Sequence, residues 1–166
     1  MAPTKSIANG FRKALSFSGR DSRAEYWWFS GFTTLTLFGT AILVDSLPPG
    51  TQTVAYKLWL LGLVVFTVLY LSSTFRRLHD TGRSGFQAFE PLLVFAIYGA
   101  VFVITAMGFL NSEDSDAAGW LIGILALNAL LSLAFLITMA RLVFRLTRPS
   151  EPGPNKYGPN PNEVSS

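Results

Sequence analysis

Four long stretches without a charged side chain constrain this 166-residue chain more than any other feature. They cover residues 26–44, 58–75, 91–112 and 117–140, and they are 19, 18, 22 and 24 residues long. A helix that crosses a bilayer core of about 30 Å needs roughly 20 residues at about 1.5 Å each. A soluble helical bundle would need polar faces, which these stretches hardly provide. The sequence therefore predicts an all-α, polytopic membrane protein with four transmembrane helices.

Turn signals and composition set the expected domain organisation. We predict a four-span membrane domain over residues 1–148, with spans at about 26–45, 54–75, 91–110 and 118–140. Asp45 and Pro48-Pro49-Gly50 end the first span, and an acidic loop over residues 111–116 follows the third. Residues 149–166 are rich in Pro, Gly and Asn, which predicts an extended tail without a core of its own.

The N-terminal segment carries a pattern typical of a helix at the membrane surface. Ile7, Phe11 and Leu15 recur every four residues, whereas the basic side chains lie on other faces. Such a helix would rest its apolar face in the headgroup region. The alternative is a frayed polar terminus. Trp27 and Trp28, at the start of the first span, are suited to the boundary between membrane and water.

Basic residues predict the orientation of the chain in the membrane. Twelve of the 13 Lys and Arg residues lie in the N-terminal segment, the middle loop or the C-terminal segment, and Lys57 is the exception. Cytoplasmic loops carry the excess of Lys and Arg. We therefore expect both termini in the cytoplasm, together with a structured polar cap made by residues 19–25, 76–85 and 141–148.

The predicted cap contains two sets of candidate site residues. Ser22 and Glu25 have the spacing of a capping box, and Asp80 can pair with an arginine three or four residues before it. The candidate structural network of the cap is Ser22, Glu25, Asp80, Gly82 and Ser84, with Gly82 as a helix C-cap. The candidate headgroup- or partner-binding residues are Arg20, Arg23, Arg76, Arg77, His79 and Arg83.

Three interpretations of the cap remain open from its residues. The first is a network of salt bridges and caps that only locks the loop, with Glu25 and Asp80 satisfied chiefly by Arg76 and Arg77. The second is a site for an anionic lipid phosphate, because the arginines exceed the carboxylates. The third is a catalytic pair of His79 and Asp80, although adjacent residues on a helix do not face each other.

The motifs together resemble a known family. Phe17-x-Gly19-Arg20-x-x-Arg23-x-Glu25-Tyr26-Trp27-Trp28 and the run from Arg76 to Gly85 are similar to the "domain of unknown function 805" family of small bacterial inner-membrane proteins. The tail Asn155-Lys156-Tyr157-Gly158-Pro159-Asn160-Pro161 resembles that family's usual ending, and Phe86 stands where tryptophan is expected. The resemblance implies a bacterial inner-membrane location and a multi-span helical domain. It carries over no active site.

We expect a non-enzymatic membrane module that engages anionic lipid or a partner protein, or a second copy of itself, through the arginine-rich cap. The alternatives are a small transporter or channel and, third, an enzyme acting on lipid headgroups. The chain has no cysteine and one histidine, so we expect no metal and no cofactor. Orientation in the membrane explains the net charge of +3, and a nucleic-acid partner is not expected. A weak GxxxG pattern at Gly119 and Gly123 permits close helix approach.

Overall fold

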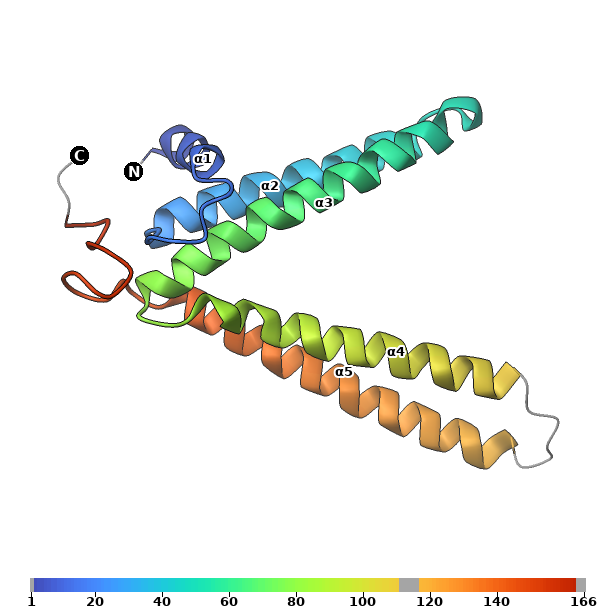
Figure 1. Cartoon of the computed structure of the whole chain (residues 1–166). Coiled ribbons are helices and arrows are strands. Elements are labelled where there is room, and N and C mark those ends of the chain that lie inside the picture. The colour runs from blue at the N-terminus through green and yellow to red at the C-terminus, as the bar shows by residue number, and fades with distance from the viewer. Residues whose placement is uncertain (1, 111–116, 164–166) are drawn as a thin grey trace. The chain divides into compact units, whose positions relative to one another are not determined.

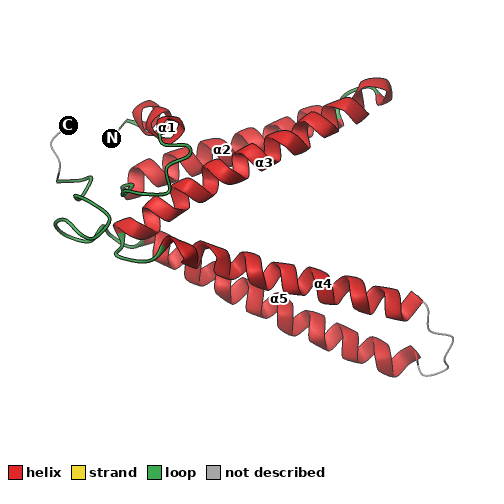
Figure 2. Cartoon of the chain, viewed as in Figure 1, coloured by secondary structure: helices red, strands yellow, loops and turns green. Residues whose placement is uncertain are grey.

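Helices account for all the regular secondary structure that is described (Figure 2). The computed structural model describes residues 2–110 and 117–163, so the predicted acidic loop over 111–116 lies outside the described residues. The elements are α1 (Pro3–Arg12), α2 (Arg23–Asp45), α3 (Pro49–Asp80), the 3₁₀ helix η1 (Gly85–Phe89), α4 (Glu90–Leu110) and α5 (Ala117–Thr147).

The long helices have the length and composition that the four apolar stretches predict. Within the described residues, four helical segments are long and apolar enough to cross a membrane, and they are Arg23–Asp45, Pro49–Asp80, Gly85–Gly108 and Leu121–Thr147. Large apolar side chains project outward along them, as at Leu35, which is 75% exposed. Such a surface suits lipid and would be costly in water. The prediction of an all-α, four-span, multi-pass membrane protein is confirmed.

The chain divides into two compact units. The first unit comprises Met1–Gly85 and Leu146–Ser166, and the second comprises Phe86–Arg145. In the first unit, α2 and α3 form an antiparallel hairpin and lie side by side along their length (Figure 1). The Trp59 indole N–H on α3 donates to the Leu37 carbonyl on α2 at 3.3 Å, which joins the two helices within the apolar region.

The N-terminal helix α1 packs on the start of α2. The ring of Phe11 meets Phe29 and Phe32 edge to face, with centroids 5.3 Å and 5.9 Å apart. Gly10 lies against the Phe29 ring, where any Cβ would overlap it, so a glycine is required for this close approach. The predicted N-terminal helix is therefore present. It ends at Arg12, earlier than expected, and leaves Leu15 79% exposed beyond it.

Both predicted caps around the polar end of the hairpin are confirmed. At the start of α2, the Ser22 hydroxyl accepts from the Glu25 backbone N–H at 3.3 Å, and the Glu25 carboxylate accepts from the Ser22 N–H at 3.0 Å. At the end of α3, Gly82 adopts a φ of 72°, a left-handed conformation that glycine tolerates best. Its N–H donates to the His79 carbonyl, and the Arg83 N–H reaches the Leu78 carbonyl, which together form a Schellman motif.

The second unit is the hairpin of α4 and α5, preceded by η1. Ser84, a candidate residue of the cap network, directly precedes this 3₁₀ turn, after which Pro91 occupies the first turn of α4. Arg145 of α5 donates to Glu90 of α4 at 2.8 Å. Phe95 and Phe135 pack with ring centroids 5.6 Å apart.

Candidate functional site

Five charged side chains gather where α2 begins and α3 ends. We call Arg20, Asp21, Arg76, Arg77 and Asp80 the arginine–aspartate cluster. None of the five is more than 6% exposed, and Arg77 and Asp80 are 0% exposed. Removing charges from water is costly unless each one finds a partner of opposite charge. Each arginine of the cluster pairs with an aspartate, and Asp80 serves two of them, although Arg76 Nη2 is buried without a hydrogen-bond partner among the described residues.

Asp80 is the centre of one half of the cluster. Its Oδ1 accepts from Arg20 Nε at 3.0 Å, and its Oδ2 accepts from Arg77 Nη1 and from the Ser150 hydroxyl. The remaining nitrogens of Arg77 donate to the carbonyls of Leu146 and Arg148. Because all three Arg77 nitrogens are used within the chain, this arginine holds the end of α5 to the end of α3.

Asp21 is the centre of the other half. Its Oδ2 accepts from Arg76 Nε at 2.8 Å, and its Oδ1 accepts from the Lys13 ammonium at 3.1 Å. Arg76 Nη1 also donates to the carbonyls of Lys13 and Ser16, at 2.8 Å and 2.6 Å. These bonds fix the loop between α1 and α2 against α3.

The pairing differs in part from the sequence-based expectation. Arg77 does pair with Asp80, three residues later on the same helix. Arg76 instead turns to Asp21, and Glu25 is satisfied by its capping box and by the Asn9 amide at 3.3 Å. The reason is geometric, since the loop before α2 brings Asp21 against α3, where its N–H also donates to the Arg76 carbonyl. Composition alone could not place Asp21 there.

The C-terminal segment also differs from the expected extended tail, because it turns back beside the end of α3 (Figure 1) and bonds to the cluster. Arg20 donates to the carbonyls of Glu151 and Gly153, at 2.7 Å and 2.8 Å, and to that of Gly158 at 3.3 Å. The Glu151 N–H donates to the Asp80 carbonyl at 2.8 Å. A Pro- and Gly-rich chain has few internal partners for its carbonyls, so a guanidinium with several donors can order it.

His79 belongs to this tail contact and not to a pair with Asp80. Its Nδ1–H donates to the Gly19 carbonyl, with the two atoms 3.2 Å apart. Its ring stacks on Tyr157, with centroids 3.7 Å apart and planes 6° apart. The Asn155 amide donates to the His79 carbonyl at 3.0 Å. The imidazole ring is therefore enclosed in the cap, and only 8% of the residue is exposed.

The remaining predicted site residues lie at the surface. Arg23, the first residue of α2, is exposed, and so are Gly82 and Ser84, whereas Arg83 is half-buried. Arg23 lines a cavity of about 330 Å³ together with Pro149, Ser150 and Asn162. The structure thus separates the six predicted headgroup-binding residues. Arg20, Arg76, Arg77 and His79 are enclosed, and Arg23 and Arg83 reach the surface.

Sequence reasoning missed the tail's part in this site. Ser150, Glu151 and Tyr157 contact the cluster or His79, yet they lie in a segment whose composition indicates a loop. The resemblance of residues 155–161 to a recurrent family ending pointed to Tyr157, and no sequence signal pointed to Ser150 or Glu151. A motif in an otherwise unstructured tail indicates that the segment has a binding surface on its own protein or on another.

These features define the class of the protein, a four-span helical membrane protein whose polar end is locked by buried arginine–aspartate pairs. The chain belongs to the family described as "Protein of unknown function (DUF805)", whose model matches residues 14–117. The match includes the arginine–aspartate cluster and ends at Ala117, the first residue of α5, well before the tail segment that contacts the cluster. Comparison with curated proteins and with solved structures finds no match.

Proposed function

We propose that this protein is a non-enzymatic membrane module that binds anionic phospholipid through the basic side chains at the polar end of its first unit. The proposal places it in a bacterial inner membrane with both termini in the cytoplasm. The observation that carries it is the position of Arg23. This arginine is exposed at the head of a membrane-spanning helix, and it takes part in no ion pair among the described residues.

The charge balance supports an anionic ligand. The first unit contains 11 Lys and Arg residues against 6 Asp and Glu residues, which leaves an excess of five positive charges. The carboxylates Asp21 and Asp80 are already engaged inside the cluster. Each basic residue near an anionic membrane surface contributes about 1 kcal/mol to the attraction. The excess therefore favours the negative lipids of a cytoplasmic leaflet.

The alternatives have less support among the described residues. A transporter needs a polar path through the membrane, whereas the two cavities between α2 and α3 have mainly apolar linings. An enzyme of the predicted kind needs His79 beside a free carboxylate. His79 is instead bonded to Gly19 and stacked on Tyr157, and Asp80 is fully engaged.

Native mass spectrometry of the gently purified protein tests the proposal. We expect the wild type to retain phosphatidylglycerol in preference to phosphatidylcholine. Arg23→Gln should reduce that preference about fivefold, which corresponds to about 1 kcal/mol. Lys57→Gln removes the same charge from the opposite end of α3 and serves as the control, with no change expected. If the wild type shows no preference, the lipid proposal fails and a partner protein becomes the better explanation.

A further inference from the structure

A cavity of about 330 Å³ lies in the first unit between the start of α2 and the C-terminal segment. Arg23 and Ala24 line it from α2, whereas Pro149, Ser150 and Asn162 line it from the tail. We call it the tail cavity. Three of these five residues belong to the tail, so the cavity exists only while the tail is docked at the polar end of the hairpin (Figure 1).

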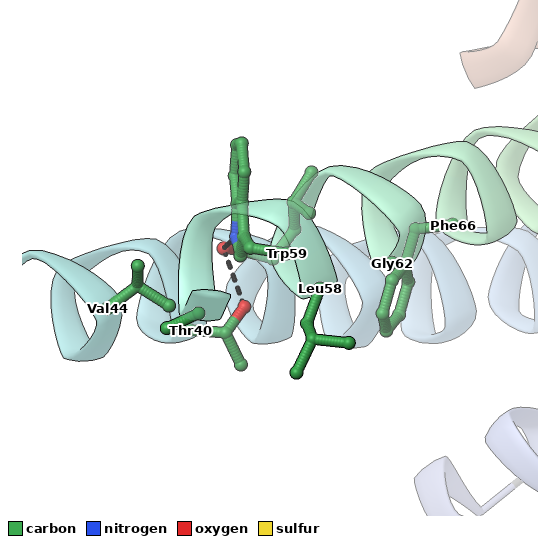
Figure 3. Close-up of a pocket in the computed structure, with 8 residues that line it drawn as sticks. Thr40, Val44, Leu58, Trp59, Gly62 and Phe66 are labelled. Atoms are coloured by element: carbon green, nitrogen blue, oxygen red, sulfur yellow. Dashed lines mark hydrogen bonds between the residues drawn. The ribbon is translucent and has the colours of Figure 1, made fainter. Parts of the chain in front are cut away.

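The chemistry of the tail cavity differs from that of the apolar cavities along α2 and α3. In the larger apolar cavity, the Trp59 N–H already donates to the Leu37 carbonyl at 3.3 Å (Figure 3). Among the described residues, by contrast, the Arg23 guanidinium has neither a hydrogen bond nor an ion pair, and no Asp or Glu lines the tail cavity with it. The tail cavity therefore presents a cation without a counter-ion to whatever enters it.

The tail side of the cavity is anchored to the arginine–aspartate cluster. Ser150 Oγ donates to Asp80 Oδ2 at 2.5 Å and accepts from Asn162 Nδ2 at 2.9 Å. The charge of Asp80 is already compensated, because this carboxylate pairs with Arg20 and Arg77. The Asn162 amide carries two N–H groups, and among the described contacts only the one to Ser150 is used. The cavity therefore has available hydrogen-bond donors on both of its sides.

We infer that the tail cavity holds one phosphate group, bound by the Arg23 guanidinium from α2 and by the Asn162 amide from the tail. The inference rests on the proposed function and makes it specific, because it replaces a diffuse surface attraction with one site and gives the tail a part in it. A guanidinium pairs with phosphate through two parallel N–H bonds, and the remaining phosphate oxygens can accept from the amide. A lipid headgroup and a soluble phosphate compound both carry this chemistry.

A phosphate in this cavity should hold the tail against the cap. The tail groups that contact His79, which are the Tyr157 ring and the Asn155 amide, lie between Ser150 and Asn162 in the sequence. Release of the tail from His79 should therefore also take Asn162 out of the cavity. A ligand that binds only the docked arrangement stabilises it by mass action. The bound phosphate should accordingly keep His79 covered.

Modification of His79 by diethyl pyrocarbonate tests this coupling on the wild-type protein. The rate in detergent with chloride is compared with the rates in inorganic phosphate at the same ionic strength, in phosphatidylglycerol and in phosphatidylcholine. Phosphatidylglycerol should slow the modification several-fold, and phosphatidylcholine should not, because its choline cation opposes Arg23. Protection by inorganic phosphate as well would assign the site to a phosphate group from either source, and its absence would assign the site to a lipid headgroup. Equal rates in all four solutions would overturn the inference.

Two matched variants separate a single site from a diffuse attraction. Asn162→Asp places a carboxylate in the tail cavity, whereas Lys156→Gln removes a positive charge from the same tail outside it, so each lowers the net charge by one. Both residues are exposed, so both variants should fold, which thermal unfolding checks.

The readout for these variants is phosphatidylglycerol retention in native mass spectrometry. We expect Asn162→Asp to lower it about tenfold and Lys156→Gln to lower it less than about twofold. Equal losses would show a diffuse surface attraction, which overturns the site and leaves the proposed function standing. If the wild type shows no preference for phosphatidylglycerol, the proposed function itself fails.

Discussion

Arg20 donates through Nε to Asp80 Oδ1 at 3.0 Å, although the two residues are 60 positions apart in the sequence. Asp80 is completely buried and Arg20 is 6% exposed. The same carboxylate also accepts from Arg77, and Arg20 also holds the carbonyls of the tail. One aspartate therefore connects the loop before α2, the end of α3 and the C-terminal segment. Loss of this carboxylate should affect all three.

Asp80→Ala should strongly destabilise the protein. It leaves Arg20 and Arg77 buried without their counter-ion, and breaking a buried pair costs about 3–5 kcal/mol. The measurement is thermal unfolding in detergent. Asp45→Ala, at the exposed far end of α2, removes a carboxylate that bonds to Tyr56 alone among the described residues and should cost less than about 1 kcal/mol. Equal, small effects for the two variants would mean that the cluster is solvated.

Arg77→Lys should be nearly as harmful as removal of the charge. Arg77 uses three nitrogens in three directions, toward Asp80, Leu146 and Arg148, and a lysine ammonium cannot reproduce that fork. Each lost bond to a charged donor costs about 1.5–3 kcal/mol. At the exposed Arg23, the same Arg→Lys change should leave the melting temperature within a degree or two. A stable Arg77→Lys variant would show that only the charge matters.

Gly85→Ala should lower stability through a clash with an aromatic ring. A Cβ at Gly85 would overlap the Phe75 ring, and overpacking of this kind costs about 1–3 kcal/mol. At Gly99 in α4, a Cβ meets no atom within 4 Å, so Gly99→Ala should be neutral or slightly stabilising. The double variant Gly85→Ala with Phe75→Leu should recover part of the loss. If the double variant is no more stable than Gly85→Ala alone, the loss of stability comes from the backbone and not from the ring.

Tyr157→Ala should uncover His79. The tyrosine ring stacks on the imidazole at 3.7 Å, and His79 is the only histidine in the chain, so its modification by diethyl pyrocarbonate reports on this one contact. We expect slow modification in the wild type and several-fold faster modification in Tyr157→Ala. Tyr98→Ala, in the second unit, is the control and should not change the rate. Unchanged reactivity of Tyr157→Ala would show that the tail leaves the cap in solution.

Cysteine accessibility should report the orientation of the spans. The chain has no native cysteine, so single cysteines at Ser18, Ser84, Thr51 and Ser115 give no background. In intact cells a membrane-impermeant thiol reagent should label Thr51→Cys, in the first turn of α3, and Ser115→Cys in the acidic loop. Ser18→Cys and Ser84→Cys should react only after the membrane is opened. External labelling of Ser84→Cys would contradict the positive-inside assignment.

The sequence by itself determined the spans and the local caps of this protein. Stretches without charge predict where helices cross a membrane, because each residue contributes its own transfer free energy to the span. The Ser22–Glu25 box and the Gly82 cap were equally readable, since their partners lie within a few residues. Arg77 with Asp80 was readable for the same reason, as a pair three residues apart on one helix.

Only the tertiary structure decided which of the other charges meet. Arg76 pairs with Asp21 and not with Glu25, because the loop before α2 lies against α3 at Arg76. The two paired residues are 55 positions apart in the chain. The tail is held in place because its carbonyls accept from Arg20 and its Tyr157 stacks on His79. No local sequence pattern encodes these contacts. Composition predicts where charges lie relative to the membrane. Burial and partner choice depend on how distant segments pack, and here packing enclosed Arg20, Arg76 and Arg77 and left Arg23 at the surface.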